Sequence, residues 1–355
     1  MHTLLQPGSL TPKTGTAAPA RVAVAGATGY TGQELLRLLS RHPSVTLTAA
    51  MSSGATAPSS TAPRRLPALA RLWTGEITPL SPETLRAADV VFLALPDAAA
   101  ADLGPALADA GVRVVDLSGA FRLKDPAERA RWYPETHRLP EGVAYGLTEL
   151  ERGAIGEARL VANPGCFPTA TLLALAPLCG AGLLAPASDI VVDAKSGVSG
   201  AGKTPSERTH FSECHGSVAA YGVFSHRHGA EIEQGVTRAA HGPHPLTFVP
   251  HLVPLDRGIL STIYVRLTAG ATEDTLAQVY QQAYAAAPFV RLVGSSLPEI
   301  KHVAHTNFCD IGWRVDSSGR AVLVSVIDNL LKGASGQAVQ NLNVMLGIDE
   351  RTGLW

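Results

Sequence analysis

The order of apolar and polar positions predicts that strands and helices alternate over the first part of the chain. Short apolar runs, typical of strands buried on both faces, are separated by segments with apolar residues at helical spacing. The predicted strands are residues 22–25, 45–50, 90–94 and 112–117, and the predicted helices are residues 33–40, 80–89 and 98–110. This alternation predicts an α/β domain with a Rossmann-type, doubly wound parallel sheet.

The second part of the chain has a different pattern. Strands are predicted at residues 158–162, 186–195, 246–253, 259–267 and 321–327, and helices at residues 169–178, 272–286 and 337–346. From residue 246 onward we expect the strands to run antiparallel, which favours an α+β domain with an open mixed sheet. Helices that close such chains often return to the first domain, and we expect this of residues 337–346.

Composition narrows the possible partners. The chain has 355 residues, too many for one ordinary core, so two domains are expected. A net charge of -1 and 17% charged residues argue against nucleic acid or an anionic membrane as partner. No apolar run reaches the roughly 18 residues of a membrane span, and no signal peptide is indicated. The four cysteines show no disulfide-like spacing, which favours a cytoplasmic location.

A glycine-rich turn follows the first predicted strand. Residues 26–32 read GATGYTG and lead directly into a predicted helix. In that context glycines let backbone N–H groups approach a pyrophosphate at the helix N-terminus, although a purely structural turn is the alternative. The candidate cofactor contacts in this turn are Gly26, Thr28, Gly29, Tyr30, Thr31 and Gly32.

The end of the second predicted strand indicates which dinucleotide is bound. An acidic residue there would bond the ribose hydroxyls of NAD, but no acidic residue occurs between Glu34 and Glu76. Ser52 and Ser53 occupy the strand end instead, which favours the 2′-phosphate of NADP. Arg64 and Arg65 could assist or could be solvated surface charges.

Cys166 lies where the strand at residues 158–162 turns into an apolar helix. Pro164 and Gly165 favour a tight turn, and Pro168 suits the first turn of a helix. The helix N-terminus should stabilise a thiolate and lower the thiol pKa from about 8.5 toward neutrality. Taken alone, Cys166 is better interpreted as a buried structural cysteine, because free cysteine is among the most buried residue types; the features described below reverse this.

Two other patterns offer competing interpretations. Residues 197–204 match the P-loop pattern GxxxxGK[ST], but the segment after them has Phe211 as its one large apolar residue and cannot form a helix that packs on a sheet. Cys214 and His215, with His210, could ligate a metal, but no second ligand cluster lies beside them. We therefore expect no bound metal and no nucleotide hydrolysis.

The remaining candidate catalytic and substrate-binding residues are polar residues that follow strand ends or lie in turns. His226 and His228 precede a predicted helix and point the same way if the backbone is extended, so one could exchange protons with Cys166. Arg122 and Ser118 follow the strand at residues 112–117, where ligands bind in open α/β sheets, and Arg257 lies in a turn. The two arginines are candidates for a carboxylate or phosphate.

Six stretches carry a family resemblance over nearly the whole chain. They are residues 26–39 (GATGYTGQELLRLL), 161–170 (VANPGCFPTA), 195–203 (KSGVSGAGK), 226–234 (HRHGAEIEQ), 250–264 (PHLVPLDRGILSTIY) and 328–343 (DNLLKGASGQAVQNLN). The chain thereby resembles the N-acetyl-gamma-glutamyl-phosphate reductase family of the aspartate-semialdehyde dehydrogenase superfamily. Aspartyl-phosphate or carrier-linked amino-acid phosphate reductases are the alternative within this superfamily.

The resemblance implies roles for particular residues. Cys166 would be the nucleophile, His226 the acid and base, and His228 a substrate-binding group. Ser196, Gly197, Leu95, Pro96 and Asn329 would lie at the NADP(H) cofactor. Asp97, Ala120 and Asp256 depart from the expected family pattern and bear on details of the substrate pocket.

The sequence also predicts a division of the chain. Residues 1–20 are rich in Thr, Pro, Ala and Gly and would be a flexible tail. Residues 21–162, with the returning segment 330–355, would bind NADP. Residues 163–329 would carry catalysis, substrate binding and the contacts of a homodimer or homotetramer.

Overall fold

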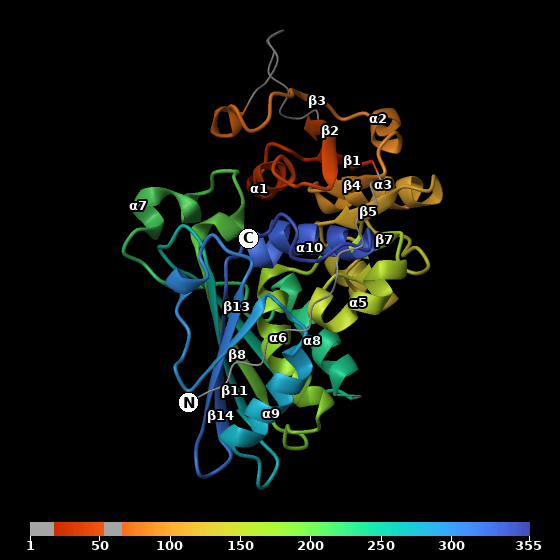
Figure 1. Ribbon diagram of the computed structural model, residues 1–355. Coiled ribbons are helices and arrows are strands. Elements are labelled where there is room, and N and C mark those ends of the chain that lie inside the picture. The colour runs from red at the N-terminus through yellow and green to blue at the C-terminus, as the bar shows by residue number, and fades with distance from the viewer. Residues whose placement is uncertain (1–17, 53–65, 241) are drawn as a thin grey trace, which may run out of the picture.

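The structure is a computed structural model that describes residues 18–52, 66–240 and 242–355. Two seven-stranded sheets organise the described residues, one above the other in Figure 1. Most of the predicted tail, together with Ser53, Arg64 and Arg65, lies outside the described residues. The predicted α/β architecture with a second, mixed sheet is confirmed.

The first sheet is parallel throughout, in the order β3-β2-β1-β4-β5-β7-β6. Its strands are β1 (Ala20–Ala25), β2 (Val45–Ser52), β3 (Ile77–Pro79), β4 (Val90–Leu93), β5 (Arg113–Asp116), β6 (Ala144–Tyr145) and β7 (Leu160–Ala162). The helices that connect them are α1 (Tyr30–Leu39), α2 (Pro82–Arg86), α3 (Asp97–Asp109), α4 (Pro126–Trp132) and α5 (Thr148–Glu157). β3 and β6 are too short to show as apolar runs, and the sequence analysis missed them.

Successive side chains of β1 belong to different cores. Val22 and Val24 pack with the apolar side of α1, whereas Ala23 and Ala25 pack with the side covered by α2 and α3. Both pairs are fully buried, as expected of a central parallel strand with helices on both faces. The carboxyl ends of these strands therefore face a common edge, where the turn at residues 26–29 leads into α1.

The second sheet is mixed, in the order β12-β13-β14-β11-β8-β10-β9. Its strands are β8 (Ile190–Ser196), β9 (Ala219–Ala220), β10 (Leu246–Leu252), β11 (Ile259–Arg266), β12 (Val290–Gly294), β13 (Cys309–Val315) and β14 (Arg320–Ile327). The expected antiparallel pairing is confirmed for β11 with β14, whereas β10 pairs antiparallel with β9 on one side and parallel with β8 on the other. β10 runs parallel to β8, because β8 lies between β10 and β11 and separates the two strands that follow one another in sequence.

Three helices bury one face of the second sheet: α6 (Cys166–Gly180), α8 (Arg227–Ala239) and α9 (Glu273–Tyr284). The short helix α7 (Phe211–Cys214) belongs to the segment that connects β8 to β9, and it lies away from these three helices (Figure 1). After residues 197–204 the chain forms a 3-10 turn at Glu207–Thr209 and then the four-residue α7, so the launching helix of a P-loop is absent among the described residues. The NTPase alternative is therefore wrong at the level of the fold.

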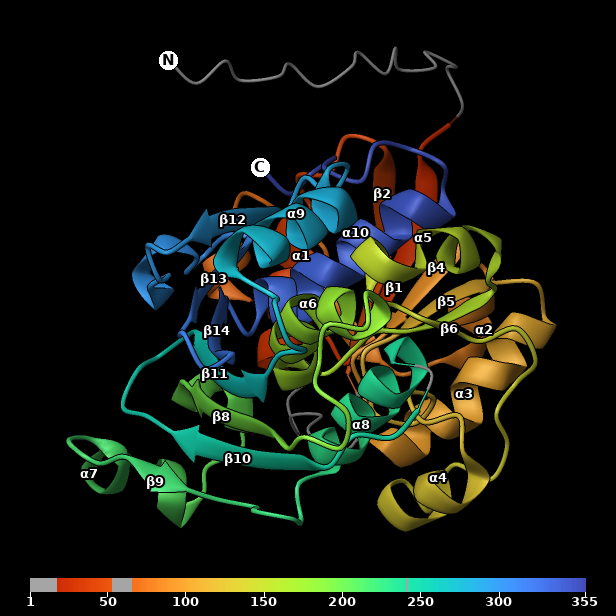
Figure 2. The same ribbon diagram turned by 90° about the horizontal axis from the view of Figure 1, so that it is seen from below.

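The closing helix α10 (Gly336–Met345) returns to the first sheet. It packs on α1 and α5 (Figure 2). A π-helical turn, Leu331–Ser335, joins β14 to α10 and contacts both α1 and α6. π-helical turns of this kind are frequent at functional sites. Among the described residues, no helix combines the length and the apolar character needed to cross a membrane.

Candidate active site

A cleft of about 540 Å³ is lined by segments from both sheets. These are the N-termini of α1, α3 and α8, the ends of β4 and β5, the turn before α6, the loop after β8 and the π-helical turn. Eleven of the residues proposed from the sequence line it: Gly29, Tyr30, Thr31, Gly32, Leu95, Pro96, Ser118, Arg122, Cys166, His228 and Asn329. The fold thus gathers residues from widely separated parts of the chain around one space.

Other proposed residues do not line the cleft. They are Gly26, Thr28, Ser52, Ser196, Gly197, His226 and Arg257. Gly26 has a packing role, because a Cβ there would lie 2.0 Å from the carbonyl oxygen of Ala94. Gly197 is similarly confined, since a Cβ would lie 2.9 Å from backbone oxygens of the turn that carries Arg257.

Arg257 is bound by carboxylates that, like Arg257 itself, do not line the cleft. Its guanidinium donates to Glu34 Oε1 at 2.6 Å and lies 3.6 Å from Asp328 Oδ2. Glu34 belongs to α1, so Arg257 fastens the turn between β10 and β11 to the first domain. The structure therefore places Arg257 as a tie between the sheets and not beside a ligand in this cleft.

The N-terminus of α1 fits a dinucleotide phosphate group. Gly29 is its N-cap, no side chain caps it, and its first turn contains no acidic residue. A Cβ on Gly29 would find its nearest neighbour 3.8 Å away, so the space in front of the helix is open. Free N–H groups and the positive end of the helix dipole are thereby available to an anion.

Cys166 is the first residue of α6, directly after the turn at residues 163–165. That turn is held in place by the backbone N–H of Asn163, which donates to the carbonyl of Asp116 at 2.7 Å. The Asn163 side chain donates to the carbonyl of Ala334 in the π-helical turn at 3.2 Å. The prediction that Cys166 lies at a helix N-terminus is confirmed.

The expected lowering of the thiol pKa is wrong for this structure. Burial raises the pKa of Cys166 to about 11, although Arg122 and the backbone N–H of Phe167 both favour the thiolate. The helix N-terminus was expected to dominate, but the loss of solvent around the sulfur outweighs it. Cys166 therefore rests as a thiol, and a base must accept its proton when it reacts.

Glu231 organises the backbone next to Cys166, and the sequence analysis assigned it no role. Its carboxylate is fully buried and accepts hydrogen bonds from the N–H of Gly165 at 2.9 Å and from Tyr145 Oη at 2.7 Å. Arg122 lies 3.4 Å from the other carboxylate oxygen. One feature of the sequence could have identified Glu231. It lies one helical turn after His228, on the face of α8 that also buries Ile232.

Most hydrogen-bond donors of the Arg122 guanidinium are directed at other groups of the protein. Its Nε donates to the carbonyl of Asn163 at 2.8 Å, and one terminal nitrogen donates to the carbonyl of Leu117 at 2.9 Å. The other terminal nitrogen lies 3.4 Å from both Glu231 and His228 Nε2. Arg122 therefore holds the Cys166 turn to β5 and presents positive charge at the cleft.

The two histidines are close together, but for a different reason from the one expected. His226 is the N-cap of α8, and its Nδ1 accepts from the backbone N–H of His228 at 3.1 Å. The backbone is extended at His226 but helical at His228, so the expected extended pair is wrong. The ring centroids lie 4.8 Å apart, and both rings contact Phe167 edge-on at 5.8 and 6.0 Å.

Both imidazoles are neutral at pH 7. Burial, assisted by Arg227, lowers the pKa of His226 to about 4. Burial and the neighbouring His226, Arg122 and Arg227 lower the pKa of His228 well below its usual value. His228 also packs against the turn before Cys166, since a Cβ on Gly165 would lie 2.5 Å from its Nε2. Neutral imidazoles next to a neutral thiol can accept its proton.

The three departures from the family pattern have different surroundings. Asp97 accepts from the N–H of Gly119 at 2.7 Å and pairs with Arg227 at 2.6 Å, so it joins the N-termini of α3 and α8 across the cleft. Ala120 is buried in the core of the first domain. Asp256 is 83% exposed and lies 3.8 Å from Arg257, which leaves it outside the cleft.

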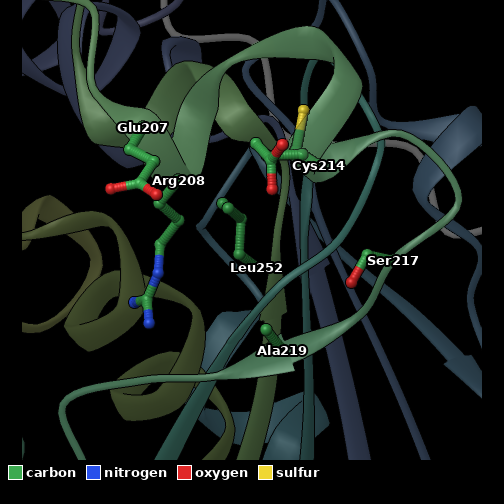
Figure 3. A pocket seen from close by; sticks show the side chains of 7 residues that line it. Glu207, Arg208, Cys214, Ser217, Ala219 and Leu252 are labelled. Atoms are coloured by element: carbon green, nitrogen blue, oxygen red, sulfur yellow. The ribbon is translucent and has the colours of Figure 1, made fainter.

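A second, separate cavity of about 270 Å³ lies beside α7 and contains Cys214. Figure 3 shows its lining side chains, with Arg208 extending away from Cys214. Within the described part of the chain, no group of three His, Cys, Asp or Glu side chains is arranged to hold a metal ion.

Two family models match the chain. The semialdehyde dehydrogenase NAD binding domain matches residues 21–158, and the semialdehyde dehydrogenase dimerisation domain matches residues 166–329. The match to an NAD binding domain shows that the cofactor is a nicotinamide dinucleotide.

Curated relatives and solved structures agree with the family models. The N-acetyl-gamma-glutamyl-phosphate reductase of Syntrophobacter fumaroxidans is 48% identical over 94% of this chain and 97% of its own. The enzyme of that name from Bacillus subtilis is 45% identical over 94% of this chain and 98% of its own. Aspartate semialdehyde dehydrogenase II from Vibrio cholerae has the same fold, with a TM-score of 0.71 at 19% identity over 93% of this chain and 99% of its own. The chain belongs to the N-acetyl-gamma-glutamyl-phosphate reductase family, within the semialdehyde dehydrogenases.

Proposed function

We propose that this chain reduces N-acetyl-L-glutamyl 5-phosphate to N-acetyl-L-glutamate 5-semialdehyde and phosphate, with NADPH as reductant. The observation that carries the proposal is a single cleft that joins Cys166 to a helix N-terminus fit for a dinucleotide phosphate. Near-full-length relatives of that name support the substrate assignment.

Cys166 is the proposed nucleophile. Its sulfur attacks the acyl carbon, the bond from that carbon to the phosphate oxygen breaks, and a thioester forms on the enzyme while phosphate leaves. The pKa values of Cys166, about 11, and of His226, about 4, keep the resting pair neutral. The proton must therefore leave sulfur as the new carbon–sulfur bond forms, with a neutral histidine as acceptor.

When bound, the reduced nicotinamide supplies the hydride that adds to the thioester carbon. The resulting thiohemiacetal oxyanion reforms its carbonyl as the carbon–sulfur bond breaks, which releases the aldehyde and leaves a thiolate on Cys166. We assign His226 as the group that returns the proton to the departing sulfur, and as the base in the reverse reaction. His228 and Ser118, with the charge of Arg122, would hold the substrate; Arg257 fits this role less well because Glu34 occupies its guanidinium.

NADPH is the proposed cofactor in preference to NADH. β2 ends at Ser52, whose side chain is buried, and the sequence has no acidic residue between Glu34 and Glu76 that could bond the ribose hydroxyls of NADH. Comparable kcat/KM values for NADPH and NADH would remove this preference.

We also infer which segments of the chain bind the cofactor and which carry catalysis and assembly. Residues 21–162 with 330–355 would bind NADP, and residues 163–329 would carry catalysis and assembly; the return of α10 to α1 and α5 supports the first part. A homodimer or homotetramer is proposed because the matched family domain over residues 166–329 is a dimerisation domain. Four free cysteines are compatible with the proposed cytoplasmic location.

The deciding experiment measures the reverse reaction. Purified protein should reduce NADP in the presence of N-acetylglutamate semialdehyde only when phosphate is added. Aspartate semialdehyde as substrate tests the closest alternative. Equal or greater turnover of aspartate semialdehyde, or turnover without phosphate, would contradict the proposed activity.

A further inference from the structure

Lys203 belongs to the P-loop-like sequence at residues 197–204, and the mechanism above leaves it without a role. Lys203 lies in the loop after β8 and lines the cleft together with residues of the N-terminus of α1. Its Nζ lies 3.4 Å from the carbonyl oxygen of Thr28, in the glycine turn that leads into α1. A residue of the second sheet's loop therefore reaches the dinucleotide-binding turn of the first domain.

Lys203 also differs from the other cations of the cleft. Arg122 lies 3.4 Å from Glu231, and Arg227 pairs with Asp97 at 2.6 Å. Among the cleft-lining residues that the structure describes, Lys203 is the cation that no carboxylate contacts. An ammonium group has three donors, and one long contact to a neutral carbonyl leaves most of that capacity for an anion.

We propose that Lys203 binds the pyrophosphate of the dinucleotide from the catalytic side of the cleft. The uncapped N-terminus of α1 offers backbone N–H groups to the same phosphates, and Lys203 adds a mobile point charge opposite them. The proposal rests on the cofactor of the proposed function. It gives the lysine of the P-loop-like sequence a phosphate-binding role without the P-loop fold.

The position of Lys203 favours the pyrophosphate over two other phosphates. The 2′-phosphate of NADPH is expected at the end of β2, near Ser52, whereas Thr28 lies in the turn directly before α1. The phosphate of the acyl substrate is expected at Cys166. A pyrophosphate contact affects NADPH and NADH equally, and this separates the three possibilities.

The test is equilibrium binding, measured by the fluorescence of the reduced nicotinamide, for wild type, Lys203→Gln and Lys203→Arg. Lys301→Gln is the matched control, because Lys301 is an exposed lysine paired with Glu299 and does not line the cleft. We expect Lys203→Gln to raise the dissociation constants of NADPH and NADH by the same factor, about 10-fold, as for the loss of a charge-assisted hydrogen bond. Lys203→Arg should recover most of the affinity, and Lys301→Gln should match wild type.

Three results would overturn the proposal. Unchanged affinity of Lys203→Gln for both dinucleotides would make Lys203 a solvated surface lysine. Weakened binding of NADPH alone would assign it to the 2′-phosphate. An altered KM for the acyl substrate with intact dinucleotide binding would assign it to the substrate. If wild type itself bound neither dinucleotide, the cofactor of the proposed function would fail instead.

Discussion

Gly333 lies directly against Cys166: a Cβ built on Gly333 would come within 2.7 Å of the Cβ of Cys166. Gly333 belongs to the π-helical turn Leu331–Ser335 and lines the cleft. The space that a side chain at Gly333 would need is therefore occupied by the proposed nucleophile. This close approach links the position of the sulfur to the backbone of the segment that returns to the first domain.

Gly333→Ala should lower kcat by about 10-fold to 100-fold, because a displacement of the reacting atom by about 1 Å can cost that much. Gly153→Ala is the control, since a Cβ on Gly153 in α5 would meet nothing within 4 Å. It should leave kcat unchanged and raise helix stability by up to about 1 kcal/mol. Steady-state kinetics and thermal unfolding of both variants test this, and equal kcat values would contradict it.

Glu231→Gln should destabilise the protein by about 3 kcal/mol, because removal of one partner from a buried ion pair leaves Arg122 without its counter-charge. The amide retains an acceptor for Gly165, so the fold should persist. Glu299→Gln provides the comparison, since solvent screens the exposed pair with Lys301 and its loss should change stability far less. Urea denaturation measures both, and similar losses in the two variants would show that burial of Glu231 has no special consequence.

Cys166→Ser should abolish turnover and leave NADPH binding nearly intact, because a serine hydroxyl is a far poorer nucleophile near neutral pH. Residual activity above about a tenth of wild type, equivalent to a loss of only about 1.4 kcal/mol, would rule out the covalent mechanism. Cys214→Ser is the control: Cys214 is also partly exposed but lies in the separate cavity beside α7. Its activity should equal that of wild type.

The lowered pKa of His226 predicts an effect on stability in acid. Its folded-state pKa of about 4 lies below the unfolded value of about 6.5, so the unfolded chain binds more protons in this window. Stability is therefore lost as the pH falls from about 6.5 to about 4. In His226→Asn, the loss of unfolding free energy between pH 7 and pH 5 should be smaller than in wild type by about 1 kcal/mol, after allowance for partial exposure. An identical loss in urea titrations would contradict the buried, neutral state.

The parts of the fold that were predicted depend on local patterns. β1, α1 and the N-terminus of α6 follow from apolar runs, glycines and prolines that act within a few residues. The position of β8 between β10 and β11 depends on pairing between distant segments, which periodicity does not encode. Short strands such as β6 and β9, each of two residues, have no pattern of their own.

The same distinction applies to the site. Cys166 and the glycine turn could be identified because the residues that shape them are adjacent in sequence. The sequence could not show that Arg257 binds a carboxylate of α1 and not a ligand, because its partner Glu34 is 223 residues away. The thiol pKa was mispredicted because the helix N-terminus is a local feature, whereas burial of the sulfur depends on the whole fold.

The histidines allow the sharpest test of the mechanism. His226 contacts Tyr221 and Phe167 with its ring, whereas His228 faces the cleft and lies against Gly165. If His226 exchanges protons with the sulfur, His226→Asn should lower kcat by about 10² to 10⁴ and remove a titration from the kcat profile. His228→Asn should instead raise KM more than it lowers kcat, as expected of a binding group.

Both variants should be measured across pH with saturating NADPH, and their folding should be checked by thermal unfolding, so that a loss of structure is not mistaken for a loss of catalysis. His244→Asn is a suitable control, because His244 does not line the cleft. An unchanged kcat in His226→Asn would remove it from the mechanism. A reversed pattern, with the large kcat loss in His228→Asn, would transfer the acid and base role to the histidine that the structure places at the cleft beside the turn before Cys166.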